Sequence, residues 1–281
     1  MDKVTEDEII ASWINGIEEP VVSVICISYN HEDYIEEALD SILHQKTSFP
    51  FEIVVHDDAS TDATARIIRQ YESEYPRIIK AKLRTKNIFS EVGGGFINDL
   101  LSEAKGEFIA ICEGDDAWID RTKLEKQVFT LRKNDKLSIS IHNAIVEDCR
   151  SGDRHIFNKS DLPEILSLKD IFFRGWFSPT ASFFFRNSGW NGDIRKDVNG
   201  DMVILFENAL NGAIHYSPEP MSLYRYFSSS SLSSAADRAF LYKKKVGFYM
   251  YAFKKVRAPF KIILGGLMLV LLAKKTLISR K

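Results

Sequence analysis

The stretch that decides the fold runs from Glu107 to Trp118 and reads Glu-Phe-Ile-Ala-Ile-Cys-Glu-Gly-Asp-Asp-Ala-Trp. Its short apolar run is typical of a buried parallel strand, and the strand ends in Glu113, Asp115 and Asp116. Carboxylates this close raise one another's pKa unless a cation neutralises them. Because parallel sheets bind ligands beyond the carboxyl ends of their strands, the stretch indicates a Mg²⁺ or Mn²⁺ site. The alternative is an acidic turn in which Asp116 or Asp120 caps the next helix.

Strand and helix patterns alternate around this stretch, which predicts a three-layer α/β fold with a mostly parallel sheet. We expect strands at 21–28, 51–56 and 78–83, and helices at 32–44, 96–104 and 121–133, with one more ending at Pro76. The second strand also ends in acids, beginning with Asp57 and Asp58. Two acidic loops are therefore expected to contact one ligand from two sides.

The second half of the chain has a different pattern. We expect a half-exposed strand at 137–145, a short helix at 167–173, a strand at 180–185, a helix from Asp201 to Leu210, and closing strands at 213–216 and 221–226. Gly93-Gly94-Gly95 is not followed by the Lys and Ser or Thr of a phosphate-binding loop, and no G-x-G-x-x-G follows the first strand. The glycines therefore indicate a flexible loop. We interpret the second half of the chain as an acceptor-binding region.

Composition and charge place the chain among ordinary globular proteins. Its 281 residues are 45% hydrophobic and 27% charged, enough for one large domain. The net charge is −2, but the charged residues are unevenly distributed along the chain. The part after Asp237 has twelve basic and no acidic residues, whereas the preceding part has 25 basic and 39 acidic residues. Three cysteines, two of them in apolar runs, indicate reduced core residues. The acidic first ten residues lack the features of a signal peptide. A cytoplasmic protein is expected.

The basic tail predicts contact with a membrane surface. A helical pattern runs from Ala235 to Pro259, and an apolar run of twelve residues follows, from Ile262 to Ala273. As a helix, that run would cover roughly 18 Å, short of the roughly 30 Å hydrocarbon core. An amphipathic helix in the interface of an anionic membrane fits this pattern. Packing on a partner subunit is the alternative, and nucleic acid is disfavoured because it has no use for the apolar run.

Five motifs in order resemble the family 2 glycosyltransferases of the GT-A fold. They are Val-Ser-Val-Ile-Cys-Ile-Ser-Tyr-Asn at 22–30, Tyr34-Ile35 with Ser41-Ile42-Leu43-x-Gln45, Asp57-Asp58-Ala59-Ser60-Thr61-Asp62, Ala104-Lys105-Gly106-Glu107-Phe108-Ile109, and Glu113-Gly114-Asp115-Asp116. The resemblance spans about residues 21–231 and implies a Rossmann-like sheet with helices on both faces. It divides the chain into an extension (1–20), a nucleotide-sugar-binding half (21–134), an acceptor-binding half (135–234) and the amphipathic tail (235–281).

The resemblance also implies roles for individual residues. Ser28, Tyr29, Asn30 and Asp58 would hold the uracil and ribose of a UDP-sugar, and an Asp can accept from the uracil N3–H. Asp115 and Asp116 would bind ribose and the Mn²⁺ or Mg²⁺ that bridges the diphosphate. The family often has Asp where Glu113 stands, so the role of Glu113 stays open. For Ser60 and Asp62, capping of the following helix is the favoured interpretation.

A catalytic base is expected at Asp201, because inverting members of the family use an Asp or Glu well downstream at a helix start. A carboxylate there can take the proton of the attacking hydroxyl. A plain helix cap is the alternative, with Glu207 and Asp197 as other candidates for the base. Arg225, after Tyr224, resembles a residue that closes over the diphosphate and could bind it in a bidentate manner. A surface salt bridge is equally ordinary for that arginine.

Together these features predict an inverting, metal-dependent transferase that moves a hexose from a UDP-sugar to a polyprenyl-diphosphate-linked saccharide in bacterial surface polysaccharide synthesis (O-antigen or capsule). It would work on the inner face of the cell membrane. The oligomeric state stays open. A nucleotidyltransferase is a rival, although the glycine- and lysine-rich loop it needs after the first strand is absent. A noncatalytic sugar-nucleotide-binding assembly module is a second rival, and it would have no need of Asp201.

Overall fold

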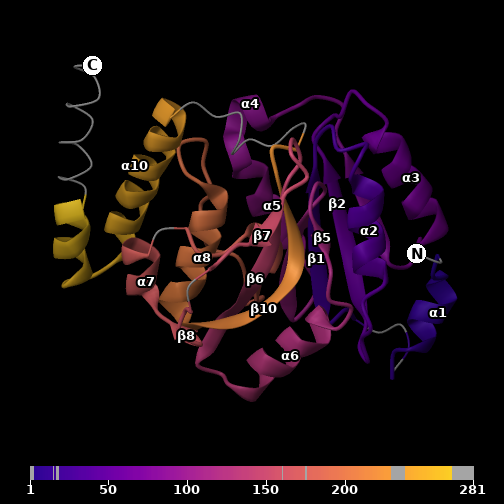
Figure 1. Ribbon diagram of the computed structural model, residues 1–281, viewed down its shortest axis with the longest axis horizontal. Coiled ribbons are helices and arrows are strands. Elements are labelled where there is room, and N and C mark those ends of the chain that lie inside the picture. The colour runs from indigo at the N-terminus through magenta and orange to yellow at the C-terminus, as the bar shows by residue number, and fades with distance from the viewer. Residues whose placement is uncertain are drawn as a thin grey trace.

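The computed structural model describes residues 3–14, 16, 19–159, 161–174, 176–228 and 238–267. One sheet runs through it in the order β3-β2-β1-β4-β9-β6-β10-β5, with β7 paired to β6 and β8 to β10. In Figure 1 the sheet lies in the centre, with α1, α2 and α3 on one side and α7, α8 and α10 on the other. The expected α/β architecture with helices on both faces is confirmed.

The first half follows the expected alternation closely. Its strands are β1 (Val22–Ser28), β2 (Phe51–Asp57), β3 (Ile79–Leu83) and β4 (Phe108–Glu113), and its helices are α1 (Glu6–Ala11), α2 (Ile35–Leu43), α3 (Thr64–Glu74), α4 (Phe89–Val92), α5 (Ile97–Glu103) and α6 (Lys123–Lys133). β1 pairs in parallel with both β2 and β4, and β2 in parallel with β3. The carboxyl ends of these four strands therefore share one edge of the sheet.

The second half completes the sheet with both strand directions. It contains β5 (Ala117–Trp118), β6 (Leu137–Asp148), β7 (Arg154–Ile156), β8 (Ile165–Leu166), α7 (Leu168–Phe173), β9 (Phe184–Arg186), α8 (Gly200–Asn211), β10 (Ala213–Tyr226) and α10 (Arg238–Lys255). β6 and β10 are parallel, whereas the short β9 joins β4 and β6 in antiparallel fashion. One continuous sheet thus joins the two halves.

Three expectations for the second half were wrong in detail. β6 is not half-exposed, because it lies between β9 and β10, and its polar Ser138, Ser140 and His142 are at most 5% exposed. The two closing strands are one strand, β10, whose pairing shifts register around Pro220 because proline donates no ladder hydrogen bond. The strand expected from Thr180 begins as a 3-10 helix, Thr180–Ser182, before β9.

The triple glycine is also not a flexible loop. Gly93–Phe96 forms a 3-10 helix, and Gly93 has a φ of +60°. A Cβ atom on Gly93 would lie 2.7 Å from the Cα atom of Lys196. The glycines are therefore needed because the backbone before α8 passes directly against them.

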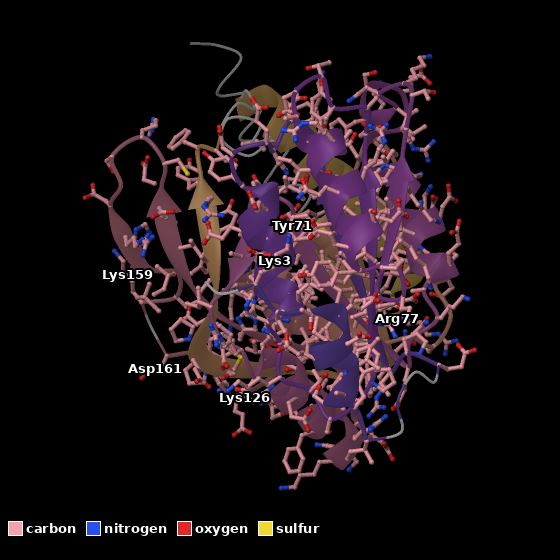
Figure 2. The ribbon with its side chains drawn as sticks, turned by 90° about the vertical axis from the view of Figure 1, so that its right-hand side faces the viewer. Lys3, Tyr71, Arg77, Lys126, Lys159 and Asp161 are labelled. Atoms are coloured by element: carbon pink, nitrogen blue, oxygen red, sulfur yellow. The ribbon has the colours of Figure 1, made fainter. Side chains whose placement is uncertain are left out.

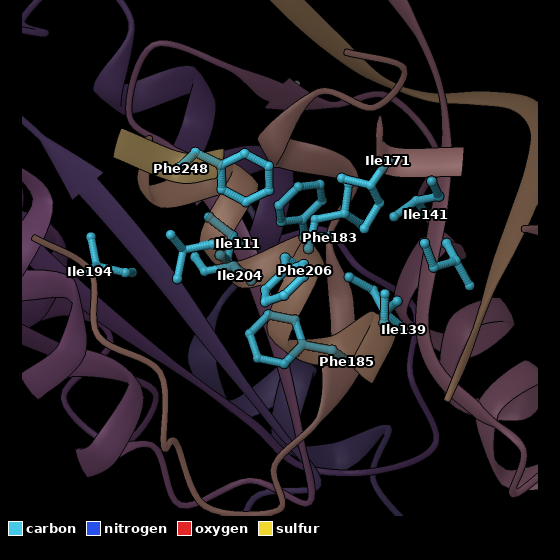
Figure 3. Packing of buried hydrophobic residues seen from close by; sticks show 14 of the residues in the cluster. Ile111, Ile139, Ile141, Ile171, Phe183, Phe185, Ile194, Ile204, Phe206 and Phe248 are labelled. Atoms are coloured by element: carbon cyan, nitrogen blue, oxygen red, sulfur yellow. The ribbon is translucent and has the colours of Figure 1, made fainter. Parts of the chain in front are cut away.

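Alternating side chains of the central strands belong to two different hydrophobic cores. On β1, Val22, Val24 and Cys26 pack with α2, α3 and α6, whereas Ile25 faces the other side. That second core joins β4, β6, β9, α5, α7, α8 and α10, and Figure 3 shows Phe206 and Phe248 within it. Cys26 and Cys112 are buried free thiols, which agrees with their expected place in the core.

The N-terminal extension packs onto the first half of the fold. Ile9 and Trp13 are buried in the core beside α2 and α3. Glu6 accepts from the backbone N–H of Arg77 at 2.7 Å, and the Lys3 ammonium lies 5.1 Å from the ring centroid of Tyr71. Figure 2 shows Lys3, Tyr71 and Arg77 on this face. Residues 3–14 are thus part of the domain.

α10 packs on the body in the same way, so part of the tail that was expected to lie on a membrane belongs to the core. Phe248, Tyr249 and Tyr251 are at most 6% exposed and lie in the core with α8. Burying such a side chain contributes on the order of 2 kcal/mol. Lys255 also pairs with Glu207 of α8 at 2.7 Å. The large apolar side chains of α10 that stay exposed among the described residues are Phe240, Leu241, Met250 and Phe253.

Gly247 sets how closely α10 can approach, and this gives a test of the packing. A Cβ atom there would lie 2.0 Å from the carbonyl oxygen of Asp197. We expect Gly247→Ala to lower the free energy of unfolding by about 3 kcal/mol, because backbone atoms cannot move aside as a flexible side chain can. Urea unfolding would measure this change.

Gly265→Ala is the matched control for this prediction. Gly265 lies in the helical segment 260–267, and a Cβ atom there meets open space. The control should raise stability by up to about 1 kcal/mol through helix propensity. Equal effects of the two variants would contradict the packing of α10 against residue 197.

Within the described part of the chain, no helix is both long enough and apolar enough to cross a bilayer. The apolar run expected to lie in the membrane interface is described only as far as Leu267, and its remainder, residues 268–273, lies outside the described residues.

Candidate functional site

The acidic loops after β2 and β4 flank the end of β1. Ser28 stands in register with Asp57, and Ile27 with Glu113. Because β1 pairs in parallel with both strands, the two loops lie on either side of one strand end. The expectation that they meet at one edge of the sheet is confirmed.

A cavity of about 1480 Å³ opens at this edge. It is lined by the end of β1, both acidic loops, the start of α8 and the end of β10, which contribute Ser28, Tyr29, Asn30, Asp58, Glu113, Asp115, Asp201 and Arg225 among others. Asp116, which was expected to bind the metal, does not line it. A cavity of this size is large enough for a nucleotide-sugar.

Ser28, Tyr29 and Asn30 line the cavity in different ways. Tyr29 is 37% exposed and presents its ring, whereas the Ser28 hydroxyl is buried and donates to the carbonyl of His56 at 3.2 Å. Asn30 adopts a φ of +54°, and its side-chain oxygen accepts from the N–H of Thr61 at 2.8 Å. Asn30 thereby ties the first strand end to the acidic loop after β2.

Asp58 is buried and holds the segment that leads into α4. Its two carboxylate oxygens accept from the backbone N–H groups of Ile88 and Phe89, at 2.9 and 3.0 Å. A carboxylate has about four lone-pair sites, so these bonds leave room for a further donor from a ligand. Asp62 accepts from the N–H of Thr64 at 2.9 Å, but the N-cap residue of α3 is Ala63 and makes no side-chain cap hydrogen bond, so the expected capping of this helix by Ser60 or Asp62 is wrong.

Burial and mutual repulsion act on the acids after β4. Burial, with the neighbouring Asp115 and Asp201, raises the pKa of Glu113 to about 8. Burial, followed by Asp115 and Glu113, raises the pKa of Asp116 well above its ordinary value. Asp116 Oδ1 accepts from the N–H of Arg225 at 2.9 Å, and its Oδ2 is buried with no hydrogen-bond partner among the described residues. The cluster has an excess of negative charge that a bound cation would relieve.

These acids fit a divalent cation that binds together with a diphosphate. Among the described residues, no three His, Cys, Asp or Glu side chains form a closed metal cage. A phosphate-bound Mg²⁺ needs only one or two carboxylates, since phosphate oxygens and water complete its shell. Asp115 lines the cavity and accepts from the Ser228 hydroxyl at 2.6 Å. Asp120 instead accepts from the N–H of Thr122 at 2.7 Å, ahead of α6.

Arg225 lies inside the protein and is not a surface salt bridge. It is 5% exposed, its Nη1 donates to the carbonyl of Asp115 at 3.0 Å, and its guanidinium pairs with Glu37 and Glu147. Because its backbone N–H also binds Asp116, the arginine fixes both aspartates in place. It reaches the cavity as well, so the expected contact with a diphosphate stays a prediction.

Asp201 lies in the first turn of α8 and lines the cavity. Its Oδ1 accepts from the N–H of Met202 at 2.6 Å. Burial raises its pKa to about 6. Of the other candidates for the base, Glu207 accepts from the Tyr251 hydroxyl inside the α8–α10 contact, and the Asp197 side chain is 63% exposed beside Arg195. Neither of them lines the cavity.

Three cavity residues were not singled out from the sequence. His31 Nε2 lies 3.8 Å from Asp115 Oδ2, Thr180 interacts with Glu113, and Lys244 of α10 donates to the carbonyl of Val198 at 2.9 Å. Lys244 lies near enough to Asp201 to hold its pKa down. His31 follows directly on the first motif, which could have indicated it. Nothing in the sequence of a basic tail indicates that one lysine enters the site.

Comparison with known proteins settles the family. The model of glycosyl transferase family 2 matches residues 23–191, which include both acidic loops. The chain belongs to glycosyl transferase family 2. An uncharacterised protein of Mycobacterium tuberculosis is 39% identical over 207 residues, which cover 73% of this chain and 58% of that protein. TuaG of Bacillus subtilis, provisionally named a teichuronic acid biosynthesis glycosyltransferase, is 35% identical over 54% of this chain and 57% of its own.

Solved structures share the fold of this family 2 domain. S. aureus TarS in complex with UDP-GlcNAc superposes with a TM-score of 0.64 at 22% identity and covers 88% of this chain and 71% of its own. The mannosyltransferase PcManGT of Pyrobaculum calidifontis, in complex with GDP-Man and Mn²⁺, gives a TM-score of 0.56 at 21% identity, with 89% and 70% covered. The expected GT-A fold is confirmed. This glycosyltransferase domain spans a little over half the length of the curated relatives it matches.

Proposed function

We propose that the protein is an inverting, metal-dependent glycosyltransferase that moves a hexose from a UDP-sugar to a polyprenyl-diphosphate-linked saccharide. The observation that carries this proposal is the single cavity in which both acidic loops meet Asp201. One wall of that cavity can hold a nucleotide diphosphate, and the other offers a carboxylate to an acceptor hydroxyl. The pathway would be surface polysaccharide synthesis, as the names of TuaG and of a poly(ribitol-phosphate) glucosyltransferase indicate for those relatives.

The donor end of the cavity would be the edge formed by β1, β2 and β4. Asp58 would accept from the uracil N3–H, while Ser28, Tyr29 and Asn30 would line the nucleoside. Support for a UDP-sugar comes from TarS, whereas PcManGT binds GDP-Man. Asp115 and Asp116 would hold Mn²⁺ or Mg²⁺, which would stabilise charge on the departing diphosphate. Arg225 would both position these aspartates and contact the diphosphate.

At the acceptor end, Asp201 would act as the general base. Its elevated pKa suits proton transfer near neutral pH, because a base is most effective when its pKa lies close to the working pH. The Met202 N–H bound to Oδ1 fixes the carboxylate in one orientation. Removal of the hydroxyl proton as the oxygen attacks the anomeric carbon opposite the departing diphosphate gives inversion.

The location would be the cytoplasmic face of the membrane. Exposed apolar side chains remain on α10 and just after it, including Phe240, Met250 and Ile262, among the lysines of the same segment. Apolar side chains flanked by cations suit an anionic lipid surface. Family membership disfavours the two rivals, a nucleotidyltransferase and a noncatalytic binding module.

Metal-dependent release of UDP tests this function. Purified protein incubated with UDP-glucose or UDP-galactose, Mn²⁺ and a lipid-linked saccharide should release UDP together with a glycosylated lipid. Because the diphosphate must be neutralised to leave, EDTA should lower the rate at least about a hundredfold, and added Mn²⁺ should restore it. Release that continues unchanged in EDTA would contradict a metal-dependent transferase.

The pH dependence tests the assignment of Asp201. A base must be unprotonated, so we expect kcat to fall about tenfold per pH unit below a pKa of about 6. The raised pKa of Asp201 has the opposite effect on stability, because acid pH lowers the rate but favours the folded state. Since folding raises this pKa from 3.8 to about 6, the group stabilises the fold at acid pH, and that contribution is lost as the pH rises through 6. A rate that is level between pH 5 and 7 would contradict the assignment.

A further inference from the structure

The cavity extends well beyond what a nucleotide-sugar and Asp201 require. From the start of α8 it continues between α7 and α10, where its lining becomes apolar. We define this extension, the apolar arm, by Phe172, Trp176, Phe240, Leu241, Phe248 and Tyr249. Figure 1 shows α7, α8 and α10 side by side on one side of the sheet. No step proposed for the donor or the base uses these residues.

The apolar arm has a packed floor and an open rim. The rings of Phe172 and Phe248 stack with centroids 6.1 Å apart, and Phe172 lies 5.9 Å from Tyr249. These three are almost fully buried, whereas Trp176, Phe240 and Leu241 are 38%, 43% and 41% exposed. Side chains that line a cavity and remain this exposed mark its mouth. The mouth is therefore apolar.

Two lysines of α10 lie one helical turn from this mouth. Lys244 and Lys245 both line the cavity, and each lies four residues after one of the rim residues Phe240 and Leu241. Residues four apart lie on the same face of a helix, one turn from each other. Lys244 is 8% exposed and near Asp201, whereas Lys245 is exposed. On α10, the two lysines thus lie one helical turn from the apolar rim and one turn from the floor residues Phe248 and Tyr249, and Lys244 lies near the base.

A cavity that combines a candidate base, two cations and apolar surface suits an amphiphile with an anionic group between its sugar and its hydrocarbon chain. We propose that the apolar arm is the subsite for the first isoprene units of the acceptor, and that Lys244 and Lys245 receive its diphosphate. A saccharide presents many hydroxyl groups, whereas of the six side chains that define the arm only Trp176 and Tyr249 carry a hydrogen-bonding group. The inference rests on the proposed function, because it assumes that the acceptor sugar lies at Asp201.

Binding of farnesyl diphosphate tests the subsite without turnover. The titration follows tryptophan fluorescence in EDTA, so that no metal can hold the diphosphate at the acidic loops, and Trp176→Phe identifies the responding ring. Farnesyl diphosphate should bind at least about tenfold more tightly than inorganic pyrophosphate or farnesol, because only it engages both lysines and apolar surface. Equal affinity for pyrophosphate and farnesyl diphosphate would overturn the proposal.

Matched variants locate the binding. Leu241→Asp should weaken farnesyl diphosphate at least about tenfold, whereas Phe129→Asp makes a comparable change at a phenylalanine that is 66% exposed on α6 and outside the cavity. Lys245→Gln should weaken it about fivefold, against Lys136→Gln, an exposed lysine outside the cavity. If each cavity variant behaves as its control does, the arm is not the subsite.

Transfer assays separate this inference from the function on which it rests. With a farnesyl-diphosphate-linked sugar, the KM should be at least about tenfold lower than with the same sugar on methyl diphosphate. Transfer with equal KM values would overturn the subsite and leave the transferase intact. Tight farnesyl diphosphate binding without UDP release from any UDP-hexose would overturn the function and leave the subsite standing.

Discussion

Asp201→Asn is expected to bind the donor as the native protein does and to lose about a thousandfold in kcat, because an amide cannot take the proton of the attacking hydroxyl. The substitution preserves the shape of the side chain, and the amide oxygen can still accept from the Met202 N–H. The fold should therefore persist, with stability at neutral pH equal to or above that of the native chain, since a buried charge is removed. Steady-state UDP release with Mn²⁺ measures kcat, the donor KM reports donor binding, and urea unfolding measures stability.

Asp197→Asn is the matched control for this loss. Its carboxylate belongs to the same segment but is 63% exposed, so we expect activity within about twofold of native. A loss of less than about tenfold in Asp201→Asn would place the base elsewhere. A similar loss in both variants would indicate a disturbed start of α8 and not a missing base.

Asp115→Asn has the second largest expected effect, on donor binding as well as on turnover. Asp115 lines the cavity, and its carboxylate would hold the cation that neutralises the diphosphate. A neutral amide is a poorer ligand for a hard cation. We expect UDP affinity in Mn²⁺ to fall about a hundredfold and kcat at least as much. The readout is the rise in Tm that UDP causes with Mn²⁺ and the absence of this rise in EDTA.

The control for Asp115→Asn is Asp135→Asn, at a carboxylate that is 95% exposed and far from the cavity lining. It should keep the full Mn²⁺-dependent rise in Tm. If Asp115→Asn also keeps it, the metal is held elsewhere. If the rise is equally large in EDTA for the native protein, the nucleotide binds without a metal.

The core of the site could be predicted because it depends on local pattern. Buried parallel strands read as apolar β-branched runs, and the acids that end β2 and β4 stand immediately after such runs. Parallel pairing alone then brings the two loops to one edge. The start of α8 beside Asp201 could be predicted for a similar reason, since a helix start leaves a clear sequence signal, whereas the role of Asp201 as a base came from the resemblance to the family and stays a prediction.

The roles of Arg225, Asp58 and α10 depend on contacts over long sequence separations. Whether Arg225 lies on the surface or is buried beside Asp115 depends on where β10 enters the sheet, and no local pattern reports that. Asp58 binds the segment before α4, which lies some 30 residues later in the chain. The aromatic residues of α10 read equally well as a membrane face and as a core face, because both are apolar.

By itself, the sequence determined the strands of the first half, their parallel direction and the acids at their ends, since hydrophobic period and turn residues act within a few positions. Only the tertiary structure decided that the basic tail packs on the body through Phe248 and Tyr251. It also decided that Lys244 of this tail lines the cavity. The physical reason is that burial depends on which surface a helix meets. A lysine keeps the same place in the sequence whether it faces water, lipid or a carboxylate.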